Sequence, residues 1–198
     1  KISNVLSRSW IREGAWSPTD IANCKLWLDF SDATTLFIDA GITPVSGDGD
    51  AIYQANDKSG NGFNVIQAMG ANRPLYKTGI QNGLSSGYFN TDDFLARSDA
   101  LGFSGNPAIT VIGVWKDTDD REFTHCLMHL GKNPADAGTV IYYRFNAIEG
   151  EFSYRWNNGN LLFDNNYSAG TIYLTTFKTP ADGQYSDGVF YLNGSLIA

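Results

Sequence analysis

The sequence predicts an all-β protein, a jelly-roll β-sandwich of two antiparallel sheets, on three observations. Short runs rich in Val, Ile, Thr, Tyr and Phe follow one another at regular spacing, as in sandwich folds. Asn-Gly pairs at 158–159 and 193–194 separate such runs, and this dipeptide favours the tight turn of a β-hairpin. No segment has a sustained apolar period of 3.6 residues, which an amphipathic helix requires.

The composition supports a globular domain and excludes several classes of function. Hydrophobic residues make up 42% of the 198 residues and charged residues 18%, below the usual ~25%. The formal net charge is -7, and Lys and Arg are scattered singly, which argues against binding to nucleic acid. No apolar run approaches the ~20 residues that span a bilayer, so membrane insertion is not expected.

The elements follow in chain order. Residues 1–15 read as an arm or linker, and 16–198 as one sandwich domain. A short helix near 17–23 is predicted, capped by Ser17 with Pro18 in its first turn. The expected strands are 26–30, 88–90, 108–116, 124–130, 139–146, 151–156, 161–163, 171–179, 188–192 and 195–198. Segment 108–116 is apolar on both parities, which predicts a central strand that is covered on both sides.

Several strings in the first half have a recognisable pattern. They include W-S-P-T-D-I at 16–21, K-L-W-L-D-F-S-D at 25–32, N-D-K-S-G-N-G at 56–62 and Y-F-N-T-D-D-F-L at 88–95, together with V-F-Y-L-N-G-S-L-I-A at 189–198. The chain thereby resembles the concanavalin A-like (LamG-type) lectin/glucanase superfamily, in the variant found in bacteriophage virion and bacterial surface proteins. The resemblance implies a sandwich with one concave face, and rim loops that bind carbohydrate, often with calcium.

Such domains usually continue beyond the hairpin that ends here at Ala198. We therefore expect the domain to lack its closing strands, so that further chain or a neighbouring subunit supplies the edge. This favours a homo-oligomeric or larger assembly.

Catalytic chemistry is not expected. A glycan hydrolase needs two carboxylates on one side of a strand, and Glu149 with Glu151 is the nearest candidate, although it lies at a turn. The acids at 117–122 read as a solvated loop. His125 and His129 could share a strand face, but structural or surface roles suit them better. No G-x-S-x-G motif anchors a nucleophile.

The loop at 57–62 imitates the start of a calcium loop. Asp57, Ser59 and Asn61 supply oxygens at its first, third and fifth positions, and Gly62 follows. A carboxylate of Asp92 or Asp93 could join them. The alternative is a tight turn held by side-chain hydrogen bonds, because the expected Glu at the twelfth position is missing.

Strand parity selects the glycan-binding candidates. In 151–156 and 139–146 the aromatic sides read as core, which leaves polar sides for a ligand. The candidates are Tyr142, Arg144 and Arg155 on the concave face, with Asn157 and Asn158 in the adjoining loop.

The two cysteines, Cys24 and Cys126, have no zinc spacing. They are two buried thiols or one disulfide, and the sequence leaves both open.

Three functions follow as hypotheses. The first is a non-catalytic binding or adhesion module on a virion surface or in another extracellular setting, contacting host-surface glycans as a decoration, tail or fibre component. The second is a purely structural virion subunit that contacts other subunits. The third is a glycan hydrolase of the same fold.

Overall fold

A computed structural model shows an all-β protein, which confirms the predicted class. It describes residues 16–90, 92–103, 107–116, 118, 124–130, 141–146, 151–156, 159–164, 170–181 and 187–197. Within these, every strand pair is antiparallel, and the helices are three-residue 3-10 turns. None of these helices has the length and hydropathy to span a membrane. The chain divides into two compact units, Lys1–Leu101 and Gly102–Ala198.

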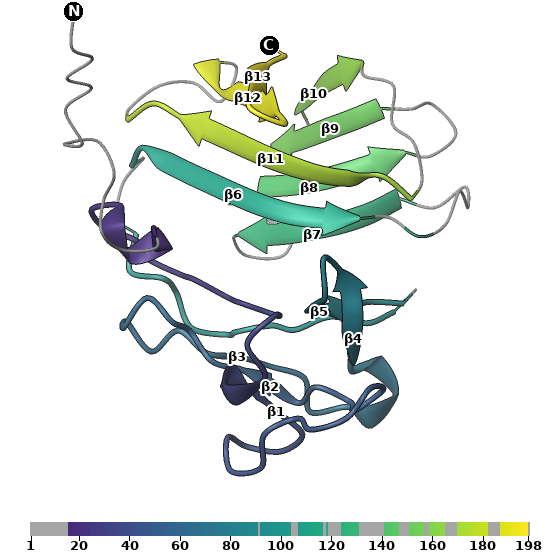
Figure 1. The fold of residues 1–198 in the computed structure, drawn as a ribbon. Coiled ribbons are helices and arrows are strands. Elements are labelled where there is room, and N and C mark those ends of the chain that lie inside the picture. The colour runs from purple at the N-terminus through teal and green to yellow at the C-terminus, as the bar shows by residue number, and fades with distance from the viewer. Residues whose placement is uncertain are drawn as a thin grey trace, which may run out of the picture. The chain divides into compact units, whose positions relative to one another are not determined.

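The first unit combines short strands with long loops (Figure 1). Its elements are η2 (Pro18–Asp20), η3 (Ala33–Thr35), β1 (Leu36–Phe37), β2 (Gln54–Ala55), β3 (Val65–Ile66), η4 (Gly70–Asn72), β4 (Leu75–Gln81) and β5 (Leu84–Tyr88). Strands β1, β2 and β3 form one sheet, and β4 and β5 form a hairpin. The buried core cluster consists of Leu36, Val45, Ile52, Ala55, Val65 and Tyr76.

The turns of this unit follow from local sequence. Ser17 caps η2 and shares a capping box with Asp20, so the predicted helix near 17–23 is confirmed, as a single 3-10 turn. Asn82 and Gly83 join β4 to β5 with φ values of 50° and 77°, as a two-residue hairpin turn requires. The sequence analysis missed this hairpin, although its Asn-Gly pair is the same signal as at 193–194. The strand predicted at 88–90 is wrong, because Tyr88 ends β5 and residues 89–90 form no strand.

The second unit contains two four-stranded sheets. Its strands are β6 (Ile109–Lys116), β7 (Thr124–Leu130), β8 (Ile141–Asn146), β9 (Glu151–Trp156), β10 (Gly159–Asp164), β11 (Ile172–Thr179), β12 (Val189–Leu192) and β13 (Ser195–Leu196). The sheet orders are β10-β9-β8-β7 and β13-β12-β11-β6. These strands confirm the predicted runs within their described parts.

The Asn-Gly turns behave as expected where they are described. Asn193 and Gly194 have φ values of 51° and 81° and connect β12 to β13. Strands β9 and β10 pair up to Trp156 and Gly159. The residues between them, 157–158, lie outside the described part of the chain.

One face of the β6–β11–β12 sheet carries the core of the second unit. Val111, Phe177 and Phe190 are direct cross-strand partners, and all three are buried. The buried hydroxyl of Thr175 donates to the Gly113 carbonyl at 3.3 Å. Alternation of side chains along each strand therefore separates this face from the opposite one.

Two further strand predictions are wrong. Strand β6 lies at the edge of its described sheet, and Val114 is 72% exposed, so segment 108–116 is neither central nor covered on both sides. Apolar residues are common on protein surfaces, so two apolar parities do not require two buried faces. Segment 26–30 forms no strand. Its Trp27 backbone bonds instead to the 57–58 loop, with Trp27 N–H donating to Asp57 and Lys58 N–H to the Trp27 carbonyl.

Candidate functional site

The candidate site occupies one face of the sheet formed by β7 to β10. Tyr142 on β8 is the direct partner of His129 on β7 and of Arg155 on β9. Alternate positions of a strand share a face, and direct partners on neighbouring strands do too. We call this face the polar face. Its three cross-strand rows are His129–Tyr142–Arg155–Asn160, Cys126–Arg144–Ser153–Leu162 and Thr124–Asn146–Glu151–Asp164.

Aromatic residues occupy the alternate positions of the same strands. Tyr143 is the partner of Tyr154, and Phe145 is the partner of Phe152. An antiparallel sheet commonly covers its apolar face and leaves its polar face to water. By this rule the polar face is the one expected to meet a ligand.

Charge is distributed unevenly over the polar face. Glu151 and Asp164 are direct partners in one end row, whereas Arg155 stands in the opposite end row. Arg144, in the middle row, is diagonal to both Arg155 and Glu151. Among the described register positions, those next to Arg155 hold no carboxylate, so the register separates Arg155 from the two acids of the opposite end row.

The predicted glycan-binding residues can now be placed. Tyr142, Arg144 and Arg155 hold neighbouring positions of the polar face. Asn157 and Asn158 lie outside the described residues. Their role in glycan binding stays a prediction.

The glycan-binding candidates selected from the sequence did not include Ser153 or His129, which share the polar face with Asn160. The two-residue alternation along β9 identifies Ser153. The pairing of β9 with β10, which the Asn-Gly signal already indicated, identifies Asn160. The position of His129 depends on an irregularity in β7 that no sequence signal marks.

That irregularity also separates the two histidines. The register of β7 against β8 shifts between Cys126 and His129, so His125 opposes Phe145 while His129 opposes Tyr142. Because Phe145 and Tyr142 are three residues apart, they occupy opposite faces. The expectation that His125 and His129 share a strand face is therefore wrong, and the reason is the bulge between them.

The 57–62 loop is a hydrogen-bonded turn. The Asp57 carboxylate accepts four hydrogen bonds, from the amides of Trp27, Ser59 and Phe63 and from the Ser59 hydroxyl, at 2.7–3.0 Å. Burial alone would raise the pKa of Asp57, but these donors outweigh it and hold the pKa below its ordinary value. Asp57 thus ties the loop to the segment around Trp27.

The three predicted calcium ligands do meet in this loop. Ser59 Oγ lies 2.7 Å from Asp57, and Asn61 Nδ2 lies 2.9 Å from Ser59 Oγ. Asn61 also donates to the carbonyls of Cys24 and Lys25. Hydrogen-bond donors already surround the oxygens of Asp57. The geometry therefore favours a hydrogen-bonded turn over a calcium site.

Of the two acids suggested as further ligands, Asp93 has its carboxylate engaged locally, where it accepts from the amide of Asn90 at 2.8 Å. The contact of Asp92 with Asn72 is through its backbone carbonyl. Across the described residues, no group of three or more His, Cys, Asp or Glu side chains could hold a metal ion. Calcium binding stays a prediction.

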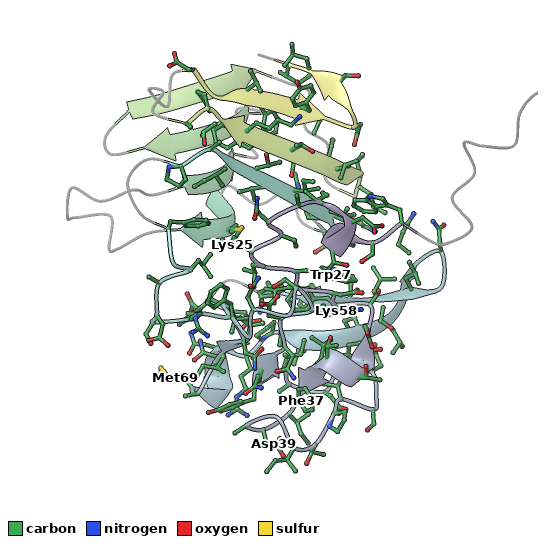
Figure 2. The ribbon with its side chains drawn as sticks, turned by 90° about the vertical axis from the view of Figure 1, so that its left-hand side faces the viewer. Lys25, Trp27, Phe37, Asp39, Lys58 and Met69 are labelled. Carbon is green, nitrogen blue, oxygen red and sulfur yellow. The ribbon has the colours of Figure 1, made fainter. Side chains whose placement is uncertain are left out.

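Lys58 forms the best-defined charged cluster of the first unit. Its ammonium lies 2.8 Å from both Asp29 and Asp32 and 4.5 Å from the centre of the Trp27 ring, beside which it is labelled in Figure 2. Burial alone would lower the pKa of Lys58, but the hydrogen bonds and charges of the two carboxylates outweigh it and raise the pKa above its ordinary value. A lysine held charged in this way is a structural tie rather than a nucleophile.

The remaining chemical candidates do not assemble into a described centre. Glu149 and the acids of 117–122 lie outside the described residues, and Glu151 begins β9 opposite Asn146. Cys24 is a free, half-buried thiol. Burial and the nearby Asp57 carboxylate raise the Cys24 pKa, which disfavours the reactive thiolate at neutral pH.

Comparison with known proteins gives no family assignment. No protein-family model, curated protein or solved structure matches the chain. The resemblance to the concanavalin A-like superfamily therefore stays a prediction from the sequence.

Proposed function

We propose that this chain is a non-catalytic carbohydrate-binding module whose polar face, on strands β7 to β10, contacts glycans. The observation that carries the proposal is the register: Tyr142 lies between His129 and Arg155 in one row, with Asn160 next to Arg155. Sugar sites combine an aromatic surface with a few placed polar groups, since sugars present both apolar ring faces and hydroxyls. A β-sandwich of the concanavalin A-like type would place such a face on its concave side.

The proposed setting is a virion surface or another extracellular surface, where the module would contact host glycans as part of a larger assembly. The low charge content and the family resemblance support this setting.

The test is a glycan array probed with the full chain, with calcium and with chelator. The variant Tyr142→Ala is expected to lose the selective binding that the wild-type chain shows. Tyr88→Ala, which removes a half-exposed tyrosine at the end of β5 in the first unit, is the matched control. Selective binding that Tyr142→Ala leaves unchanged would move the site off the polar face, and a folded chain that binds no glycan would refute the module.

A structural role in an assembly is the second candidate, and one observation favours it. On the β6–β11 sheet, Val114 and Leu174 are direct partners and both are exposed, with Ile112 exposed two residues along β6. A contiguous exposed apolar surface marks many protein contacts. If this role holds, Val114→Glu will dissociate an oligomer that sedimentation detects for the wild-type chain, and a monomeric wild-type chain would exclude self-association through this surface.

A further inference from the structure

We propose that the polar face selects acidic glycans, through recognition of a sugar carboxylate by Arg155 and Arg144 beside Tyr142. This inference rests on the proposed function, because it names the substrate class of the same face. It starts from a contrast: the chain as a whole carries a net charge of -7, yet one end row of this face holds Arg155 and His129, and the middle row next to it holds Arg144.

The register brings these cations together. Arg155 is the direct partner of Tyr142, and Arg144 follows Tyr142 by two residues on the same strand. Diagonal neighbours on a sheet face are about 7–8 Å apart. The two arginines therefore occupy register positions close enough together for one sugar residue over Tyr142 to meet both.

The neighbours of the two arginines give them different roles. Arg144 has Glu151 at a diagonal position, whereas no acid stands at the described neighbouring positions of Arg155, which hold Tyr142, Asn160, Ser153, Leu162 and Arg144 itself. Arg155 is thus the arginine with no carboxylate at a described neighbouring register position. We assign it the main contact with the ligand and give Arg144 a supporting role.

A carboxylate is the anion that fits this arrangement best. The guanidinium is planar and presents its donors in a fork that matches the two oxygens of a carboxylate. The amide of Asn160, the hydroxyl of Ser153 and the imidazole of His129 can donate to or accept from sugar hydroxyls. An acidic peptide could pair with the arginines, but it would offer no sugar hydroxyls to these smaller polar groups, so we favour a uronate-containing glycan.

The experiment compares two probes that differ in the carboxylate alone. Binding of the full chain is measured, with chelator present, to polygalacturonate and to its fully methyl-esterified form. Alginate and hyaluronate are further acidic glycans. Poly-glutamate tests whether the chain binds a polymer of carboxylates that contains no sugar. The expected result is binding to at least one uronate polymer, no detectable binding to the methyl ester, and weakening as salt is raised.

Variants then test the assignment. Arg155→Gln should weaken binding to the acidic polymer roughly tenfold or more, and Arg155→Lys should restore part of it, because charge returns without the fork. Lys116→Gln is the charge-matched control, an exposed cation on β6 in the other sheet of the same unit. Thermal melts of each variant separate lost binding from lost folding.

The outcomes distinguish the two proposals. Equal binding to the acidic and esterified polymers, or binding to neutral glycans alone, would overturn acidic selectivity and leave the carbohydrate-binding module standing. Poly-glutamate binding as tight as that of the uronates would replace the glycan with an acidic peptide. If a folded chain binds no glycan of either kind, both the inference and the proposed function fail.

Discussion

Tyr142 and Arg155 are direct cross-strand partners on β8 and β9, one position away from the Tyr143–Tyr154 pair on the same two strands. Because successive strand residues alternate between faces, these two adjacent pairs belong to opposite faces. One face of the sheet therefore places Tyr142 next to arginines, with two acids in the opposite end row, while the other face has aromatic residues on β8 and β9. This separation underlies the proposed function and its restriction to acidic glycans.

The core of the second unit depends on Phe177. This side chain is 0% exposed, between its partners Val111 and Phe190. Phe177→Ala is expected to lower the free energy of unfolding by about 3–5 kcal/mol, through lost burial and the cavity left behind. Leu174→Ala, at an exposed position of the same strand, should cost well under half as much. Urea denaturation of the two variants checks this, and equal losses would place the core elsewhere.

The Asp57 turn gives the first unit a dependence on acid pH. The pKa of Asp57 is lower in the folded state than in the unfolded chain. The carboxylate therefore contributes fully to the free energy of unfolding above the ordinary Asp pKa of about 3.9, and this contribution is lost as the pH falls through the folded-state pKa. Asp57→Asn should cost roughly 1–3 kcal/mol at pH 7, since it removes a charged acceptor.

Unfolding curves measured from pH 7 down to pH 2 test this prediction. The gap between Asp57→Asn and the wild-type chain should close as pH falls below that range. Asp99→Asn, at an exposed acid paired with Arg97, is the control and should change little. A gap that stays constant with pH would show that the carboxylate charge of Asp57 is not what stabilises the turn.

Lys58 is expected to stabilise the fold because its ammonium pairs with two carboxylates that would otherwise repel each other. Lys58→Met leaves Asp29 and Asp32 close together without the cation that lowers the pKa of both. The expected loss is roughly 1 kcal/mol at pH 7, the scale of a partly exposed ion pair. This loss of stability should shrink in acid, because both carboxylates become protonated. At high pH the raised pKa of Lys58 keeps its ammonium charged up to and beyond the ordinary lysine pKa of about 10.4.

The matched rescue for Lys58→Met is the addition of Asp29→Asn, which removes one of the repelling charges. Thermal melts should show the double variant recovering part of the stability that Lys58→Met loses. A double variant less stable than Lys58→Met would indicate that Asp29 acts through its other contacts, such as that with Ser31.

Gly87 is required by close packing in the first unit. A Cβ at this position would lie 2.7 Å from a ring carbon of Phe30 and 3.0 Å from one of Phe89, and these two rings pack edge to face at 5.5 Å. Gly87→Ala should therefore cost about 1–3 kcal/mol by overpacking. Adding Phe30→Leu should recover part of the loss, while Ser86→Ala serves as the control. Calorimetry that finds Gly87→Ala as stable as the wild-type chain would refute this contact.

Local sequence signals predicted what depends on a few neighbouring residues. Asn193 and Gly194 form the expected turn because both adopt positive φ, and Ser17 caps η2 through bonds within its own turn. The alternating pattern of β8 and β9 likewise placed Tyr142, Arg144 and Arg155 on one side, since strand geometry fixes parity.

The tertiary structure decided the features that depend on distant pairing. Segment 26–30 has a strand-like composition, but its backbone bonds go to the 57–58 loop, which is a choice between partners about thirty residues apart. The edge position of β6 depends on which strands lie beside it, and the composition of β6 carries no information about that. The bulge after Cys126 moves His129 beside Tyr142, because one extra residue inverts the parity of every position that follows. The sequence by itself therefore determined the all-β class, the hairpin turns and the polarity of each strand side, whereas long-range hydrogen bonding decided which of those sides meet.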